Sequence, residues 1–542
     1  MDLATAAKRR KRKKKKARCT PAKRKHHKKA KSSSLDAAAA RKKHRRKKRP
    51  VCKKKKRHPK PSSGTHPKVT TPATPPAPGP AAPVPPPPPP PKLSVISSPI
   101  AVYDGPFGFA QAERLLWRAG FGPRPGQAAA LATLGMEKAV LSLTRPSGTA
   151  VMDGPAPTDD GDPIAPYDHY GHDLLYWLDR MVRSRHQLVE RLALVFHDWF
   201  ATSNDAVGSA RLMLDQTNVF RANGLGSFKT MVRAITQDPA MILFLDLASN
   251  RKGAINENYA RELMELFTLG ADRGAYTEND VRELARSLSG WDYDWSEQLG
   301  VHNFHWDEAD RWDPGYKTVF GKTGRWTWED AARMVVEHPK HPSFFVAKLW
   351  SYFIPTAPPA KTARSLERLY KRDHEVRPVL EAILRHPHLY DSGRRMVKPP
   401  VVQAAGMLRA VGRGIDTTAW AWLCESAGQY LFMPPNVSGW DDTRWLDTAT
   451  FRGRWQMAQY ICEPAALDPD KAREPLDPGE LVTRAAGFLG VRLSGGVRAG
   501  LERYAKQVLA TADEDWKKDS WPALTENALR MLVATSPDYL TS

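Results

Sequence analysis

Apolar residues recur at helical spacing over most of the chain after about residue 104. In the stretch 276–291, Thr277 is expected to be the N-cap residue, with Asp280 in the place of the capping-box acid. Alternating patterns of the kind that strands show are scarce, and only short pieces such as 317–321 are expected to pair. The spacing predicts helices within 109–122, 172–200 (long enough for two), 276–291, 344–354, 401–412, 451–462 and 527–535.

These elements predict a mainly α fold, in which residues 104–542 form one large multi-helical domain. Long irregular loops are expected at 147–168, 291–328 and 426–450. Two segments of different composition precede this domain. Residues 1–60 are runs of Lys and Arg, which repel one another and leave nothing to bury, so a disordered polybasic tail is expected. Residues 61–103 are rich in proline, which predicts an extended linker.

The charge of the chain is concentrated in the tail. Residues 1–70 hold 31 of the 83 basic residues and only two acids, whereas the remaining residues hold 52 basic and 56 acidic ones. The net charge of +25 therefore describes the tail and not the domain. Such a tail binds polyanions by counterion release without reading a sequence. Its partner is expected to be nucleic acid, anionic lipid or an anionic wall polymer.

Membrane and cofactor signals are weak along this sequence. No run of 18 apolar residues occurs, so no transmembrane segment is expected. The basic N-terminus has no apolar core behind it and is not a standard signal peptide. No CxxC pair and no nucleotide-binding loop is present, so neither a cysteine-based zinc site nor a nucleotide cofactor is signalled. Cys424 and Cys462 either form one bridge or are buried thiols.

Histidines close to carboxylates are the first candidates for chemistry. With Leu188 at 0°, His197 and Asp198 fall at about 180° and about 280°, outside the apolar arc of their helix. They therefore point to solvent, a cleft or a second helix. The pair is either a general base or metal ligand with its carboxylate, or an ordinary pair at a helix end. His302 and His305 lie in an acidic loop that either holds a cation or is simply solvated.

Tryptophan is unusually frequent in the predicted loops. All 17 tryptophans follow residue 104, and the tetrad SGWD occurs at 289–292 and again at 438–441. Trp291 and Trp440 of these tetrads, together with Asn436, are candidates for a surface that stacks on sugar rings. The alternative is that the indoles fill gaps between helices and loops, with their N–H groups bonded to carbonyl oxygens.

Polar residues are also dense in the stretch 255–270, which predicts a single helix. Glu257, Arg261 and Glu265 form a stripe at spacings of four, which an ordinary ion-paired surface explains. Glu262 lies at the edge of the apolar arc, with Asn258 one turn earlier. A half-buried carboxylate needs a partner, and without one its pKa rises. Glu262 is therefore the first of the three glutamates to consider for a site.

Several of these stretches together resemble the bacterial domain-of-unknown-function 1800 family. They occur in the family's order and cover nearly all of residues 107–542. The matching segments are 114–126, 195–203, 238–246, 256–270, 276–291, 313–324, 341–354, 431–440 and 534–540. Many relatives have His-Asp where this chain has Trp-Asp, at Trp312 and Asp313. Asp313 is a binding candidate. If that histidine is a metal ligand or a base in the relatives, the same chemistry is not expected in this chain.

The resemblance implies an uncharacterised bacterial protein with no assigned activity, cofactor or site residues. Members of the family are often exported and are often encoded beside proteins that resemble sulfatases. This implies an envelope or extracytoplasmic protein that binds or organises a polysaccharide, or a sulfatase-like partner protein. Two other hypotheses remain: a hydrolase, with or without a metal, that uses His197, Asp198 and the glutamates with Arg261, or a cytoplasmic nucleoid protein that uses the tail.

Overall fold

The computed structural model describes residues 100–471 and 476–542. The predicted tail and most of the predicted linker, up to residue 99, lie outside the described residues. Residues 93–542 form one compact unit, and all of the described buried core belongs to it. We therefore expect residues 93–542 to fold on their own.

The described chain is mainly helical, as the spacing of apolar residues predicts. The helices of its first half are α1 (Phe109–Arg118), α2 (Gln127–Ala132), α3 (Gly135–Thr144), α4 (His172–Arg183), α5 (Gln187–Trp199), α6 (Asn204–Val207), α7 (Ala210–Asn223), α8 (Phe228–Thr236), α9 (Pro239–Phe244), η2 (Leu247–Ser249), α10 (Asn258–Glu262) and the π-helix η3 (Leu263–Thr268).

The second half of the chain adds further helices and three small hairpins. The helices are α11 (Glu278–Ser287), α12 (Trp328–Glu337), α13 (His341–Ser351), α14 (Ala360–Tyr370), α15 (Val376–Leu384), α16 (Pro387–Tyr390), α17 (Pro400–Val411), α18 (Ala419–Ser426), η4 (Asp442–Arg444), α19 (Thr448–Cys462), η5 (Glu463–Ala465), α20 (Pro478–Phe488), α21 (Gly495–Leu509), α22 (Asp515–Ala534) and α23 (Pro537–Leu540).

The strands pair only within hairpins. They are β1 (Thr158–Asp159) with β2 (Asp162–Pro163), β3 (Trp291–Ser296) with β4 (Gly300–Trp306), and β5 (Lys317–Val319) with β6 (Lys322–Gly324). The expected pairing near 317–321 is thus confirmed. The prediction of an irregular loop over 291–328 was wrong for 291–306, where Trp291 pairs with Trp306 across a long hairpin. A bulge between Asp292 and Asp294 interrupts its alternation, which hides the strand pattern in the sequence.

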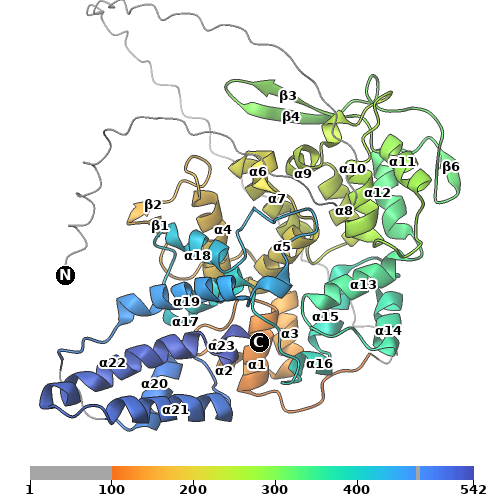
Figure 1. Ribbon diagram of the computed structural model, residues 1–542. Helices are drawn as coiled ribbons and strands as arrows, with labels where there is room; N and C mark the ends of the chain where they lie inside the picture. Colours follow the sequence, from red (N-terminus) through yellow and green to blue (C-terminus); the bar gives the residue numbers. More distant parts are fainter. Residues whose placement is uncertain (1–99, 472–475) are drawn as a thin grey trace, which may run out of the picture. The chain divides into compact units, whose positions relative to one another are not determined.

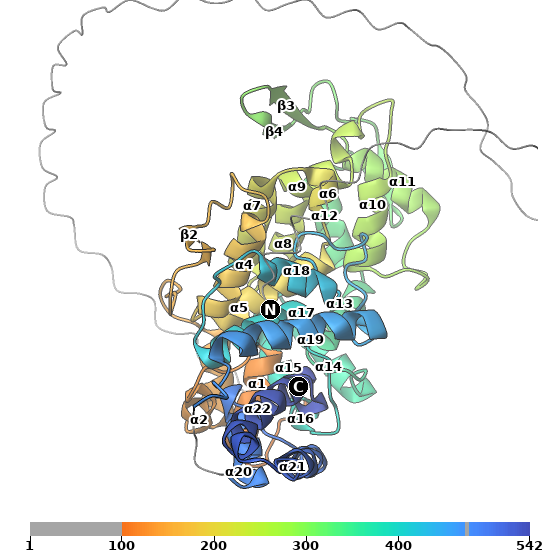
Figure 2. The ribbon, with the colours of Figure 1, turned by 60° about the vertical axis from the view of Figure 1, so that its left-hand side comes forward.

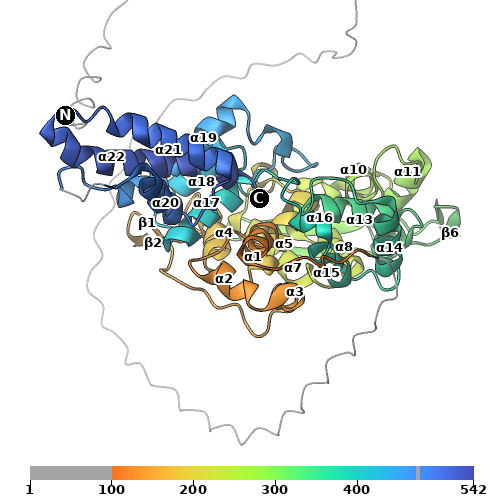
Figure 3. The same ribbon diagram turned by 90° about the horizontal axis from the view of Figure 1, so that it is seen from below.

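Helix α5 lies in the middle of the large helical body, next to α4 and α7 (Figure 1). The β3–β4 hairpin projects from one end of this body, and helices α20, α21 and α22 lie at the opposite end (Figure 2). These three helices pack on one another around a small separate core that includes Leu481, Leu501 and Leu529. Seen from below, α1 lies between α2, α3 and the C-terminal residues (Figure 3).

Local sequence signals explain where several helices begin. Thr277 caps α11, because its side chain accepts from the backbone N–H of Asp280 and the Asp280 carboxylate accepts from the N–H of Thr277. The expected break within 172–200 falls between α4 and α5. Cys424 and Cys462 are free thiols, which decides between the two alternatives for these cysteines.

The predicted helix over 255–270 begins at Asn258 and changes to a π-helix at Leu263. In the π segment the backbone N–H of Leu269 reaches the carbonyl of Met264 at 2.8 Å. Such a wide turn shifts the side chains that follow it relative to an α-helix. It also leaves carbonyl oxygens of the last turn available to other donors, which becomes important for the site described below.

Gly453 of α19 provides a test of this packing. A Cβ atom there would lie 2.3 Å from the backbone of Ser426, at the end of α18. We expect Gly453→Ala to destabilise the domain by about 1–3 kcal/mol, because backbone atoms cannot move aside cheaply. Gly487→Ala in α20, where nothing lies within 4 Å of the added atom, is the matched control and should stabilise by up to about 1 kcal/mol. Urea unfolding of residues 93–542 measures both, and equal effects would contradict this packing.

Candidate functional site

Helix α5 carries polar side chains into the interior of the domain. All but two of its thirteen residues are buried, including Glu190, Arg191 and His197. Asp198 is less than half exposed. A charged group removed from water is costly unless an opposite charge or hydrogen bonds replace the water. The partners of these four side chains therefore show which of them serve the fold alone.

Glu190 is fully partnered within the protein. Its carboxylate accepts from Arg180 at 2.8 Å and from Arg221 at 2.9 Å. Two guanidinium groups on neighbouring helices thus replace the water that this carboxylate loses. We interpret this cluster as structural.

Asp198 is also partnered, by groups from distant parts of the chain. One carboxylate oxygen accepts from the hydroxyl of Tyr352 and the other from the backbone N–H of Trp440, both at 2.8 Å. Burial raises the pKa of this carboxyl, and the two hydrogen bonds oppose the rise. Gly439 permits the approach of the Trp440 backbone: a Cβ there would lie 2.3 Å from Asp198 Oδ1, and its φ is +95°.

His197 lies in an aromatic cage instead of a polar site. Its ring is fully buried and contacts Trp177, Phe432 and Trp440 at centroid distances of 5.2, 5.7 and 5.4 Å. Neither ring nitrogen has a partner with good hydrogen-bond geometry within the described residues. Burial lowers the pKa of the imidazole to about 3, and the Gln216 side chain beside the ring opposes the fall, so the ring is neutral at physiological pH. It points away from solvent and toward neighbouring elements.

Arg191 is a buried charged side chain that lacks hydrogen-bond acceptors for part of its guanidinium. Its guanidinium is buried, and Nε and Nη1 have no hydrogen-bond acceptor among the described residues. Burial lowers its pKa to about 10, so the group still carries its charge at neutral pH. The attraction of Asp198 opposes the fall. Unlike His197, Arg191 cannot escape the cost of burial by becoming neutral.

Arg191 and Asp198 face a cavity of 520 Å³. Its walls come from α5, from the end of α13, from the segment 395–399 before α17 and from the loop that precedes α19. The sequence-predicted candidates Asp198 and Trp440 therefore meet here. Arg191 was not a candidate, although it lies seven positions before Asp198 and so shares its face of the helix to within about 20°.

The cavity is lined by more cationic than anionic side chains, and it presents hydrogen-bond donors to a ligand. Its cationic side chains are Arg118, Arg191, Lys348, Arg395 and Lys398, against the two carboxylates Asp198 and Asp442. Among its lining residues, the buried polar atoms without a partner are all N–H donors: Arg191 Nε and Nη1, Trp440 Nε1 and Trp445 Nε1. A ligand that satisfies these groups must supply acceptor oxygens, and a negative charge offsets the excess of cations.

The π-helix η3 positions Lys348 of this cavity. The carbonyl oxygen of Leu266 accepts from Lys348 Nζ at 3.0 Å, and the ammonium lies 5.0 Å from the centroid of the Trp199 ring. The next two carbonyls accept from Trp199 Nε1 at 2.9 Å and from His341 Nδ1 at 2.7 Å. Burial lowers the pKa of Lys348 to about 8. The stretch 255–270 therefore contributes to the cavity through its backbone.

The glutamates of that stretch lie outside the cavity. Glu257 pairs with Arg261 at 3.2 Å, and Arg261 pairs with Glu278 at 2.8 Å, so Glu278 takes the place expected for Glu265. Glu262 is half-buried, and burial followed by the charge of Glu265 raises its pKa. No hydrogen bond or ion pair of Glu262 occurs within the described residues. Neither these side chains nor the nearby Asn258 line the cavity.

The remaining candidates also lie elsewhere. His302 and His305 lie on β4 and contact backbone carbonyls at 3.0 and 2.8 Å. Asp313 pairs with Arg286 at 2.8 Å. Trp291 is buried against Trp328, as the gap-filling alternative expects, but its indole N–H has no acceptor among the described residues. The Asn436 side chain accepts from the N–H of Ser438. Over residues 100–471 and 476–542, no group of three or more metal-ligating side chains comes together.

The fold and the cavity define a mainly α protein with a basic cavity beside α5. Residues 114–541 match the model of the family described as "Protein of unknown function (DUF1800)", and the chain belongs to this family. The curated proteins and the solved structures contain no further match. None of the helices in the described residues has the length and apolar character needed to cross a membrane.

The contact between Tyr352 and Asp198 can be tested directly. Tyr352→Phe removes a donor from a buried carboxylate, and we expect a loss of stability of about 1–3 kcal/mol. Tyr390→Phe is the matched control, because the Tyr390 hydroxyl donates to the neutral carbonyl of Leu384 at 2.8 Å and should cost less. In the double variant with Asp198→Asn, the effect of Tyr352→Phe should shrink. Urea unfolding at pH 7 measures these three variants and the single Asp198→Asn variant, and additive effects of Tyr352→Phe and Asp198→Asn would contradict a direct bond.

Proposed function

We propose that this domain binds an anionic saccharide in the cavity beside α5. The observation that carries the proposal is Arg191, a buried guanidinium whose Nε and Nη1 lack acceptors among the described residues. Leaving such a group unpaired is strongly destabilising, which favours a role that a bound anion completes. A carboxylate, phosphate or sulfate group offers the paired oxygens that a guanidinium recognises.

The size and lining of the cavity support a ligand larger than an inorganic ion. A volume of 520 Å³ lies in the range of small-molecule sites. Trp440, Trp445 and Tyr352 line it together with the cations. An indole combines an apolar face with a donor N–H, which suits a ring that has both apolar faces and hydroxyl groups. A sugar ring that bears one anionic group satisfies both kinds of neighbour.

The proposed location is the bacterial envelope, where the polybasic residues 1–60 hold an anionic surface. This part rests on the family resemblance and on the composition of the tail. The hydrolase alternative has less support, because neither His197 nor the three glutamates line the cavity. Asp198 does line it, but both of its carboxylate oxygens already accept hydrogen bonds within the protein. Binding is therefore the function that the observations favour.

Substitution of Arg191 separates binding from stability. In residues 93–542, Arg191→Met removes a buried charge whose Nε and Nη1 lack acceptors among the described residues, while keeping most of the volume. We expect the ligand-free variant to gain up to about 1–4 kcal/mol in unfolding free energy. Galacturonic acid, galactose 6-phosphate and galactose 6-sulfate probe the three anionic groups, with neutral galactose as control. At least one of the anionic sugars should raise the Tm of the wild type, and none should raise that of the variant.

Arg221→Met is the matched control for this experiment. Arg221 is also largely buried, but it pairs with Glu190 at 2.9 Å, so its loss should destabilise by about 3–5 kcal/mol. If the folded control variant is stable enough to measure, it should keep the response to the anionic sugar. The proposal fails if none of the three sugars raises the wild-type Tm, or if Arg191→Met responds like the wild type.

The tail makes a separate contribution that can be deleted. The full chain should be retained on an anionic wall polymer in low salt, and log K should fall linearly with the logarithm of the salt concentration. A chain without residues 1–60 should lose most of that salt dependence. Sedimentation with purified wall polymer, and with DNA as the alternative polyanion, measures both chains. Retention that is equal with and without the tail would contradict this role.

A further inference from the structure

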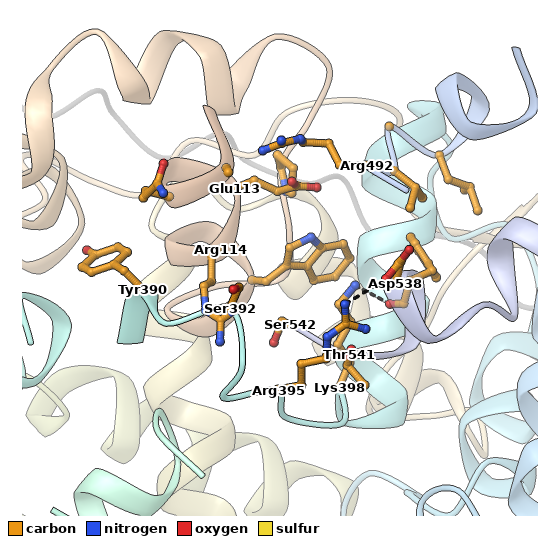
Figure 4. A pocket seen from close by; sticks show the side chains of 18 residues that line it. Glu113, Arg114, Tyr390, Ser392, Arg395, Lys398, Arg492, Asp538, Thr541 and Ser542 are labelled. Carbon is orange, nitrogen blue, oxygen red and sulfur yellow. Dashed lines mark hydrogen bonds and ion pairs between the residues drawn. The ribbon is translucent and has the colours of Figure 1, made fainter. Parts of the chain in front are cut away.

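A second cavity lies on the other side of Lys398. Its volume is 210 Å³, and its walls come from α1, from the turn after α20, from the segment 390–398 and from the C-terminal residues 538–542. Figure 4 shows Glu113 and Arg492 at one edge of this cavity, and Arg395 and Lys398 at the other. None of the candidate residues that the sequence predicts lines this cavity. Its ligand preference is therefore inferred from the charged side chains that do line it.

The two cavities share a wall made of Trp117, Arg395, Lys398 and Ser542. Lys398 is buried inside this wall. Its ammonium lies 3.5 Å from the centroid of the Trp117 ring and donates to the carbonyl oxygen of Tyr539. Arg395 lies at the surface of the wall, with 46% of its side chain exposed, and pairs with Asp538 at 3.0 Å. Of the charged side chains that line both cavities, Arg395 is therefore the one that a ligand in either cavity can reach from solvent.

The second cavity is also basic. Its arginines are Arg114, Arg395 and Arg492, against the carboxylates Glu113 and Asp538. Lys398 adds less charge, because burial lowers its pKa to about 7. Arg114 donates to two backbone carbonyls, those of Leu389 and Arg394. Arg492 differs, because it is exposed and no hydrogen bond or ion pair engages its guanidinium within the described residues. Burial raises the pKa of the nearby Glu113 carboxyl, and the charges of Lys398 and Arg492 oppose the rise. Glu113 does not form an ion pair with Arg492 in the described part of the chain, so the N–H groups of Arg492 remain open to a ligand.

We propose that the two cavities are successive subsites for one linear saccharide that carries repeated anionic groups. This inference rests on the proposed function and specifies the ligand as a chain. One anionic group binds at Arg191 in the first cavity. The chain crosses over Arg395, and a later anionic group binds at Arg492 in the second. Each cavity contributes one guanidinium that makes no hydrogen bond or ion pair among the described residues, buried at Arg191 and exposed at Arg492, and Arg395 lines both cavities.

Two linked subsites predict a dependence of affinity on chain length. Once the first group is bound, the second is held close to its own site, so its binding needs little further loss of translational freedom. An oligomer long enough to reach Arg492 should therefore bind at least about ten-fold more tightly than the monosaccharide. Shorter oligomers that end before Arg395 should gain little. A single site would instead show affinities that hardly change with length.

Calorimetry on residues 93–542 tests this directly, because the polybasic tail is then absent. The probes are oligogalacturonates and chondroitin 6-sulfate oligosaccharides of increasing length, beside galacturonic acid and galactose 6-sulfate as monosaccharides. We expect Arg492→Ala to remove most of the gain with length. Arg503→Ala is the matched control: this arginine is also exposed, on α21, but lines neither cavity. The affinities of the Arg503→Ala variant for oligosaccharides of each length should equal those of the wild type.

The outcomes separate this inference from the proposed function. If neither monosaccharides nor oligomers bind, the proposed function itself fails. If monosaccharides bind but affinity does not rise with length, the cavities are not successive subsites. The same conclusion follows if affinity rises with length equally in wild type and in Arg492→Ala. A gain that Arg492→Ala and Arg503→Ala reduce equally would indicate general charge attraction, and would also overturn the inference.

Discussion

The burial of charged side chains on α5 is the constraint on which the site depends. This helix lies inside the domain, so every polar group on it has to find a partner or lose its charge. Glu190 has two arginines, Asp198 has Tyr352 and a backbone N–H, and His197 is neutral. Arg191 remains charged, and its Nε and Nη1 have no hydrogen-bond acceptor within the described residues. An anion bound in the adjacent cavity can supply the acceptors that these two nitrogen atoms lack.

The stretch 255–270 contributes to this site in a way that its side chains do not suggest. Its glutamates form surface ion pairs or stay at the edge of the fold. Its π-helical turn exposes successive carbonyl oxygens, and these accept from Lys348, Trp199 and His341. A π turn is uncommon and often lies near a functional site. Here it holds a lysine at the cavity wall, which links the polar stretch 255–270 to α13.

The second SGWD tetrad also has a structural reason. Gly439 lets the chain approach Asp198 more closely than any residue with a Cβ would allow, and Trp440 follows as part of the cavity wall. The first tetrad serves a different purpose, because Trp291 begins a hairpin and packs on Trp328. Identical four-residue sequences thus have different roles, since the neighbours that they meet come from other parts of the chain.

The sequence by itself determined the helical class and the capping of α11 by Thr277, because these depend on local spacing and local hydrogen bonds. It showed that 172–200 is long enough for two helices, but not where they divide. It also placed Asp198 and Trp440 among the candidates. Only the tertiary structure decided that Asp198 meets Trp440, that His197 is caged and that Arg191 lacks an acceptor among the described residues. The physical reason is that burial and pairing depend on contacts between segments more than 150 positions apart, such as Asp198 with Tyr352 at a separation of 154. Helical spacing can place Arg191 and Asp198 on one face, but it cannot say what covers that face.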